Sequence, residues 1–389
     1  MKDIFDFDSL VNRRDSGSYK WDSTEDADVI PLWVADMDFK TAPAIIEALS
    51  KRVDHGVFGY TRVPEEYYDA TIDWFAGRHG LHVTRDEIIY TSGVVPAISA
   101  IIKGLTKPGD SVLVMTPVYN CFFSSIRNNG CRIVESQLVY ANHTYKIDWS
   151  DLEQKAADPS VTMFLLCNPH NPACRVWSVD ELKMIGEIMA RNNVKIVSDE
   201  IHGELVFPPY RYTPFATVCP EFRQSAITCS SPSKAFNIAG LQIANIFAAS
   251  AEDRRLIDRA INDNEVCDVN PMGVTALIAA YRHGQPWLEA LTQYLYDNYL
   301  TAKDMILSAL PMLDVATLEG TYLMWVDCRS LGMSSEQLEE QLLEKAKVWI
   351  NAGTMYGAAG EGFIRINLAC PRPRLVEGID RIISCLSKI

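Results

Sequence analysis

The sequence of 389 residues has ten cysteines, but none of them form a CxxC pair. Zinc sites commonly use such pairs, so a zinc-binding role is not expected. Uninterrupted apolar runs stay below the roughly 18 residues that cross a membrane. The N-terminal stretch "MKDIFDFDSLVNRRDSGSYK" lacks the apolar core of a secretory signal peptide. These absences favour a cytoplasmic protein with reduced thiols, some of them buried in apolar runs, as at Cys167 and Cys229.

Positive charge is also scarce. The chain has 36 Lys and Arg residues against 50 Asp and Glu residues, which gives a net charge of −14. That surplus disfavours nucleic acid or an anionic membrane as the main partner, although a local basic pocket for an anionic cofactor remains compatible with it. The sequence shows no internal repeat, low-complexity tract or flexible linker. Its 48% hydrophobic and 22% charged residues are ordinary for a globular protein of two or more domains.

Short apolar runs alternate with helical patterns between residues 65 and 263. The expected strands are "EIIYTS", "SVLVMT", "VTMFLLC", "VKIVSD", "SAITCS" and "QIANIFAA". The expected helices lie near residues 65–78, 93–105, 119–128, 178–192 and 251–263. Strands that are apolar on both faces are typical of a sheet covered on both sides. The alternation therefore predicts an α/β fold whose mainly parallel sheet is flanked by helices.

The pattern changes after about residue 285. One long helix is expected in "PWLEALTQYLYDNYLTAKDMILSAL", followed by strands in "TYLMWVD", "VWINAG" and "FIRINLA" and by a closing helix in "PRLVEGIDRIISCLSK". This succession predicts a smaller α+β domain over residues 286–389. Residues 51–285 are expected to form the large domain, and residues 1–50 are expected to join the small one.

Functional side chains follow the expected strands, and open α/β sheets bind ligands beyond the carboxyl ends of their strands. Ser92, Gly93 and Val94 follow the first strand and open a helix, whose backbone N–H groups suit phosphate, although a plain helix cap has the same pattern. Tyr119 follows the second strand. Its ring either packs in the core or lies against a flat ligand.

The next two strand ends carry an amide and a carboxylate. Asn171 lies in "NPHNPAC", where the two Asn-Pro pairs form a rigid turn and either amide can reach a ligand oxygen. Asp199 ends a strand expected to be buried, and a buried carboxylate needs a cationic partner such as a protonated pyridine nitrogen. His202 follows three residues later and is a second candidate ligand contact.

Lys234 lies in "CSSPSKAFNIAGLQ", after the strand "SAITCS". A surface lysine is the commonest case. A lysine in a partly apolar pocket instead has a lowered pKa, and its neutral amine forms Schiff bases with carbonyls. Ser231 and Ser233 beside it can hold a phosphate. The segment therefore suggests a lysine that binds pyridoxal 5'-phosphate.

Nearly the whole chain resembles the fold-type-I pyridoxal phosphate enzymes, the aspartate aminotransferase superfamily. "NPHNPAC" resembles the Asn-Pro-Thr-Gly element of that family, "SDEIH" its Asp-Glu-x-Tyr element, and "SPSKAFNIAGLQ" its Ser-x-Ser-Lys segment. "PLWVADMDFKTAP", "HGVFGYTR" and "NLACPR" are similar to the MalY/PatB subgroup of cystathionine β-lyases. The resemblance implies a mainly parallel seven-stranded sheet.

The resemblance also implies roles around the cofactor. Lys234 would be the Schiff-base lysine of pyridoxal 5'-phosphate, and Asp199 would face the pyridine nitrogen. Asn171 and His202 would bond the ring hydroxyl oxygen, and Tyr119 would stack on the ring. Tyr119 and Asn171 would also contact the substrate. The phosphate would be held by Ser92, Gly93, Val94, Ser231 and Ser233.

Two further roles concern the substrate and a partner subunit. Arg365, in "FIRINLA", would bind the α-carboxylate of an amino acid substrate through a bidentate pair. Tyr60 would reach the phosphate of the neighbouring subunit, which implies a homodimer with shared active sites.

The sequence departs from the family pattern at three places. His202 replaces a tyrosine, Ala173-Cys174 replaces Thr-Gly, and Gln242 stands where many relatives carry a phosphate-binding arginine. Within the resemblance, the subgroup favours a C–S β-lyase that converts L-cystathionine to homocysteine, pyruvate and ammonia. An aminotransferase uses the same motif residues and remains an alternative. A cofactor-binding regulatory protein with weak lyase activity is a third.

Overall fold

The central sheet has seven strands in the order β2-β10-β9-β8-β7-β3-β4. The structure is a computed structural model, which describes residues 5–266 and 268–389. Every neighbouring pair is parallel except those of β10, which runs antiparallel to β2 and β9. The predicted α/β fold with a mainly parallel seven-stranded sheet is therefore confirmed. The strands are β2 (Ile88–Thr91), β3 (Ser111–Thr116), β4 (Arg132–Gln137), β7 (Val161–Cys167), β8 (Lys195–Asp199), β9 (Ala226–Ser230) and β10 (Ala244–Ala248).

Alternate residues of the buried strands supply two hydrophobic cores, one on each face of the sheet. In β3, Val112 and Val114 belong to one core, whereas Leu113 and Met115 belong to the other. The first core is covered by α3 (Val94–Leu105), α4 (Asn120–Asn128) and α7 (Ala251–Asn262). The second is covered by α2 (Glu65–His79), α5 (Trp149–Ala156), α6 (Val179–Arg191) and α8 (Pro271–His283). Helices on both faces explain why these strands are continuously apolar.

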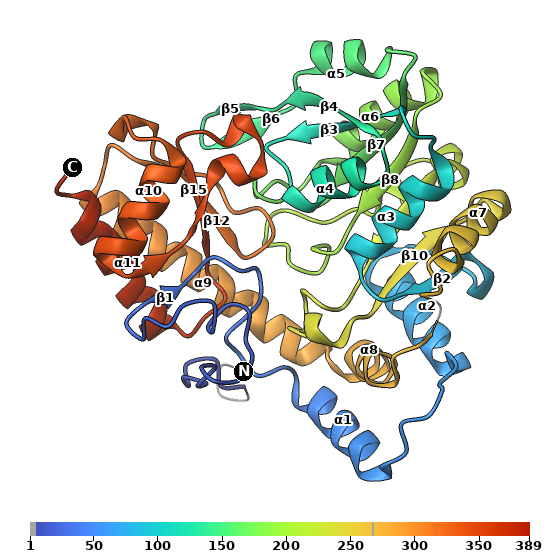
Figure 1. Cartoon of the computed structure of the whole chain (residues 1–389), viewed down its shortest axis with the longest axis horizontal. Helices are drawn as coiled ribbons and strands as arrows, with labels where there is room; N and C mark the ends of the chain where they lie inside the picture. The colour runs from blue at the N-terminus through green and yellow to red at the C-terminus, as the bar shows by residue number, and fades with distance from the viewer. Residues whose placement is uncertain (1–4, 267) are drawn as a thin grey trace.

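The long helix expected after residue 285 is α9 (Gln285–Ala309), which runs from the large sheet toward a second, smaller one (Figure 1). The smaller sheet has the order β11-β12-β15-β14 and is covered by α10 (Ser335–Gln341) and α11 (Arg372–Leu386). Its strands are β11 (Asp314–Val315), β12 (Leu323–Asp327), β14 (Asn351–Ala352) and β15 (Phe363–Asn367).

The segment "VWINAG", expected as one strand, is divided between two sheets. Its first part, β13 (Val348–Trp349), pairs in parallel with β1 (Ile30–Pro31), and its second part, β14, pairs with β15. The pairing also attaches the N-terminal segment to the C-terminal one. The predicted domain boundaries at residues 50 and 285 stay a prediction.

The helices expected from the sequence are present within a few residues of their predicted ends, and α1 (Pro43–His55) precedes them. Several elements were not predicted. They include the edge strand β4, the hairpin of β5 (Val139–Ala141) and β6 (Thr144–Lys146), and helices α5, α8 and α10. Strand β4 is mostly exposed or half-buried, so it lacks the apolar run that identifies its neighbours. Across the described residues, no helix combines the length and apolar character that a membrane span requires.

Candidate active site

A cavity of about 500 Å³ lies where the large sheet meets β15 of the smaller sheet. Five parallel strands end at this edge, since β2, β3, β7, β8 and β9 all run in the same direction. The topology thus brings their following residues together, as predicted from the sequence. The predicted site residues that line the cavity are Ser92, Gly93, Val94, Tyr119, Asn171, Asp199, His202, Ser233, Lys234 and Arg365.

The pKa values of Lys234 and Asp199 are both shifted toward neutral pH. Burial, helped by the charge of Arg365, lowers the pKa of Lys234 to about 8. Burial raises the pKa of Asp199 to about 7, although the Ile201 N–H that donates to its Oδ1 (3.2 Å) acts in the opposite direction. A lysine with such a pKa has a sizeable neutral fraction at physiological pH and can act as a nucleophile or a base.

His202 lies in the turn after β8 and packs edge-on against Tyr322, with ring centroids 6.1 Å apart. Burial, together with the charges of Lys234 and Arg365, lowers the pKa of His202 to about 3, so the imidazole is neutral. Its Nδ1 is buried and has no hydrogen-bond partner among the described residues. A buried ring nitrogen without a partner at a cavity wall is suited to a polar ligand atom.

Arg365 lies in the middle of β15 and is only 5% exposed. Its Nη1 donates to Asn171 Oδ1 (3.2 Å), and its Nη2 donates to Asn351 Oδ1 (2.9 Å) and to the Trp33 carbonyl (2.8 Å). The guanidinium also lies over the ring of Tyr356. None of these partners is a carboxylate, and Nε has no partner among the described residues. A buried guanidinium held only by neutral groups is suited to bind an anionic ligand group.

The start of α3 forms another part of the cavity wall. Gly93 precedes the helix, no side chain caps it, and its first N–H groups are therefore available to an anion. Ser233 and Gln242 line the same cavity. Ser231 lies behind the wall, where its hydroxyl donates to the Ile243 carbonyl (2.5 Å) and accepts from the Ser233 N–H (3.0 Å). A phosphate contact by Ser231 stays a prediction.

Two predicted aromatic residues have different environments. Tyr119 lines the cavity just before α4, and burial, followed by the neighbouring Cys121, raises its pKa well above the usual range, so its hydroxyl stays protonated. Tyr60 lies in the loop between α1 and α2, is 99% exposed and does not line the cavity. Its predicted contact belongs to a partner subunit.

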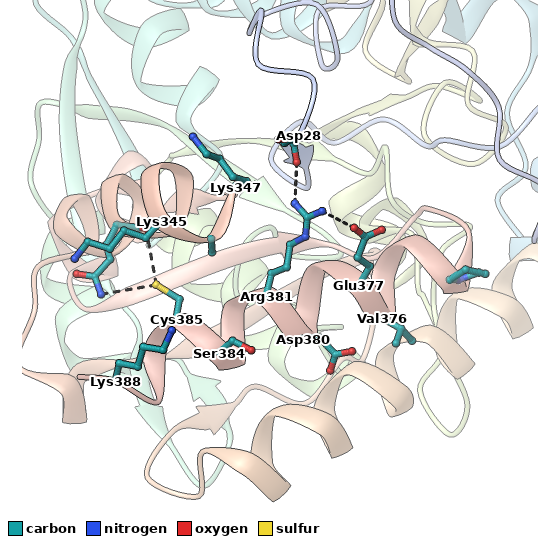
Figure 2. Close-up of a pocket in the computed structure, with 13 residues that line it drawn as sticks. Asp28, Lys345, Lys347, Val376, Glu377, Asp380, Arg381, Ser384, Cys385 and Lys388 are labelled. Carbon is teal, nitrogen blue, oxygen red and sulfur yellow. Dashed lines mark hydrogen bonds and ion pairs between the residues drawn. The ribbon is translucent and has the colours of Figure 1, made fainter.

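A second, larger hollow of about 900 Å³ lies along α11 (Figure 2). None of the predicted site residues lines it. Arg381 donates there to the Asp28 carbonyl (2.8 Å) and pairs with Glu377 (2.5 Å). Lys347, on its rim, pairs with Asp26 (2.9 Å). These pairs satisfy charge within the protein, so the strand-end cavity is the stronger candidate for chemistry.

Residues 27–382 match the family model described as aminotransferase class I and II. The chain belongs to this family. It is 40% identical to cystathionine β-lyase PatB of Bacillus subtilis (strain 168) over 98% of this chain and all of that protein. It is 34% identical to protein MalY of Escherichia coli (strain K12) over 99% of this chain and all of that protein. The crystal structure of cystalysin from Treponema denticola, which contains a pyridoxal 5'-phosphate cofactor, superposes with a TM-score of 0.96 at 36% identity, covering 99% of each chain.

The cavity of this class I and II aminotransferase family member has the groups that pyridoxal 5'-phosphate needs. Lys234 supplies an amine, Asp199 supplies a buried carboxylate that forms no ion pair with any described residue, and the start of α3 supplies an anion site. His202, whose buried Nδ1 has no hydrogen-bond partner among the described residues, lines the same cavity. The residues therefore fit the cofactor that the sequence predicted.

Several cavity residues were not predicted. Trp33 and Ala35 come from the N-terminal segment, Asn351 and Tyr356 come from the smaller sheet region, and Cys121 comes from the start of α4. The stretch "PLWVADMD" was noted for its resemblance, but no residue in it was assigned a role. Backbone carbonyls such as that of Ala35 leave no side-chain signature in a sequence.

Proposed function

We propose that the protein is a pyridoxal phosphate-dependent C–S β-lyase that acts on sulfur amino acids such as L-cystathionine. The products would be homocysteine, pyruvate and ammonia. The observation that carries the proposal is one cavity that combines an amine of lowered pKa, a buried carboxylate and a buried arginine that has no anionic partner among the described residues. The name of PatB as a cystathionine β-lyase supports the lyase class, and the pyridoxal 5'-phosphate bound in cystalysin supports the cofactor.

Each residue has a distinct task in this reaction. Arg365 binds the α-carboxylate of the substrate, and Asn171, which already accepts from Arg365 Nη1, orients the same group. The neutral amine of Lys234 takes the proton from the substrate α-carbon. Bound pyridoxal phosphate supplies the electron sink for the pair released at that carbon. Asp199 keeps a proton on the pyridine nitrogen, and Tyr119 lies against the ring. Ser92, Gly93, Val94 and Ser233 hold the phosphate, as the resemblance implies.

Aminotransfer shares the same steps up to removal of the α-proton, so the cavity residues by themselves serve both reactions. The relatives favour elimination, because PatB is named a lyase and is similar over its full length. A regulatory role without turnover is disfavoured because the cavity keeps Lys234, Asp199 and Arg365 together.

The test is incubation of the purified, cofactor-loaded protein with L-cystathionine. A lyase releases pyruvate and a free thiol in equal amounts without any added keto acid. An aminotransferase needs a keto-acid acceptor and forms no pyruvate from cystathionine. A protein that binds the cofactor but gives neither product has a binding role only. Lys234→Ala, treated identically, measures the non-enzymatic background.

We also propose that two chains form a homodimer with shared active sites. Within one chain, we propose that residues 1–50 join residues 286–389 in a small domain. The loop that carries Tyr60 is unusually apolar for a surface, since Val57 is 64% exposed and Phe58 is 58% exposed. Such a patch commonly marks a protein–protein contact. The pairing of β1 with β13 supports the proposed small domain.

A further inference from the structure

An N-terminal strap, defined here as residues 33–39, lines the cavity through Trp33, Val34 and Ala35 and is held from both sides. From the large-sheet side, Asn237 accepts from the Met37 N–H (3.0 Å) and donates to the carbonyls of Met37 (3.0 Å) and Phe39 (2.8 Å). From the small-sheet side, Arg365 donates to the Trp33 carbonyl (2.8 Å). The strap is thereby a fixed part of the cavity wall rather than a free terminal segment.

The middle of the strap is held by Asn367, which is fully buried at 0% exposure. Its Nδ2 donates to the carbonyls of Val34 (2.5 Å) and Asp36 (2.6 Å), the two residues that flank Ala35. Its Oδ1 accepts from the Ala369 N–H (2.8 Å), which locks the amide orientation. With both neighbouring carbonyls bound to Asn367, the direction of the Ala35 carbonyl is set.

The Ala35 carbonyl is the hydrogen-bond acceptor for Lys234 Nζ (2.5 Å). The hydroxyl of Tyr322 donates to the same oxygen (2.9 Å) and further fixes it. A lysine side chain has four rotatable bonds and loses reactivity when its amine samples many orientations. A fixed acceptor beside the cavity gives the free amine one preferred position.

We propose that Asn367 is a positioning residue for Lys234. By clamping the carbonyls on either side of Ala35, it aims the Ala35 carbonyl at Lys234 Nζ and so orients the free amine for proton transfer at the substrate α-carbon. Asn367 touches neither the amine nor the cavity. This inference rests on the proposed function, because the oriented amine is the base of the proposed reaction.

The chain contains a matched control. Asn298 is also 0% exposed, and its Nδ2 also donates to two carbonyls, those of Leu368 (2.9 Å) and Cys370 (3.0 Å). These carbonyls belong to the turn after β15 and do not contact Lys234. Asn298→Ala therefore removes the same kind of buried clamp from the turn that carries Ala369, while the bonds of Asn367 to the Val34 and Asp36 carbonyls are kept.

The first measurement is made on the cofactor-free full-length protein. Reductive methylation of Lys234 is followed by peptide mass spectrometry, with exposed lysines of the same sample as internal references. Asn367→Ala is expected to be modified at Lys234 several-fold faster than wild type, because the amine is no longer held by Ala35. Asn298→Ala is expected to match wild type. Equal rates in all three proteins would overturn the proposal.

The second measurement uses the cofactor-loaded proteins and L-cystathionine deuterated at the α-carbon. Asn367→Ala is expected to lower kcat about tenfold and to increase the deuterium isotope effect on kcat, since proton transfer becomes slower. KM and the cofactor spectrum are expected to change little. Asn298→Ala is expected to leave the isotope effect unchanged. A rise in KM alone, or the same isotope effect in both variants, would mean that Asn367 has only a structural role.

Tyr322→Phe provides the test if Asn367→Ala does not fold, because it removes the other donor to the Ala35 carbonyl and keeps the ring. Like Asn367→Ala, it is expected to speed the labelling of Lys234 and to increase the isotope effect, but by smaller amounts. If neither quantity changes, the result counts against the proposal. A wild-type protein that forms no pyruvate from cystathionine defeats the proposed function. The labelling measurement still decides the inference in that case.

Discussion

Lys234 and Arg365 donate hydrogen bonds to carbonyls two positions apart in the same N-terminal strap. Lys234 Nζ bonds to the Ala35 carbonyl at 2.5 Å, and Arg365 Nη2 bonds to the Trp33 carbonyl at 2.8 Å. One cation follows β9 of the large sheet, and the other lies in β15 of the small sheet. The strap therefore connects the proposed proton-transfer group with the proposed carboxylate-binding group.

Lys234→Ala is expected to remove turnover with L-cystathionine, since the proposed base and the cofactor attachment are lost together. The variant should also lack the visible absorbance of lysine-attached cofactor. Borohydride reduction of the wild-type protein, followed by peptide mass spectrometry, should find the reduced cofactor on Lys234. Attachment at another lysine, or retained activity in the variant, would contradict the assignment.

Asp199→Asn is expected to stabilise the cofactor-free protein above neutral pH while abolishing turnover. Burial raises the pKa of Asp199 from its ordinary value of 3.8 to about 7, so the folded protein holds this proton more tightly than the unfolded chain. The stability contributed by the protonated acid is complete below about pH 4 and is lost as the pH rises through about 7. Removing the group should therefore raise the free energy of unfolding at pH 8 by on the order of 4 kcal/mol at most.

The measurement is thermal or urea unfolding of both cofactor-free proteins between pH 4 and pH 8. The difference between them should shrink toward pH 4. Asp69→Asn, at an exposed position without a hydrogen-bond partner among the described residues, is the control and should follow wild type throughout. A constant difference across the pH range would show that Asp199 is ionised throughout.

Arg365→Ala is expected to weaken substrate binding and to leave the cofactor spectrum intact. A charge-assisted bidentate pair contributes about 1.5–3 kcal/mol, which corresponds to a rise in KM of roughly ten- to a hundredfold. Steady-state kinetics with L-cystathionine measures the change. Arg329→Ala, which removes a guanidinium that is 55% exposed and paired with Asp327, is the matched control and should leave KM unchanged. An unchanged KM in Arg365→Ala would exclude the proposed carboxylate contact.

A mixture of Tyr60→Phe and Lys234→Ala proteins should regain part of the lost activity if Tyr60 serves the partner's site. Subunit exchange then creates hybrid dimers in which one of the two sites has both native residues. Native mass spectrometry identifies the hybrids, and pyruvate release measures the recovery, provided that each parent is severely impaired. Hybrids that form without any recovery would place Tyr60 outside the partner's site.

The order of strands and helices could be read from the sequence because strands covered on both faces need continuous apolar runs. The same reasoning located most of the cavity. Asp199 and Lys234 each follow a strand, and parallel strands necessarily bring their carboxyl ends to one edge. Strand β4, which lies at the exposed edge of the sheet, lacks that apolar signal and was missed.

The tertiary structure decided what depends on residues far apart in the chain. Lys234 and Ala35 are 199 residues apart, and the contact uses a backbone carbonyl that any residue would carry, so no sequence pattern could reveal it. The roles of Asn367 and Asn351 are likewise set by which carbonyl or guanidinium the fold places beside them. The division of "VWINAG" between two sheets follows from the partners on either side, not from its composition. Local pattern thus determined the elements and the strand-end residues, whereas long-range packing determined the strap that joins them.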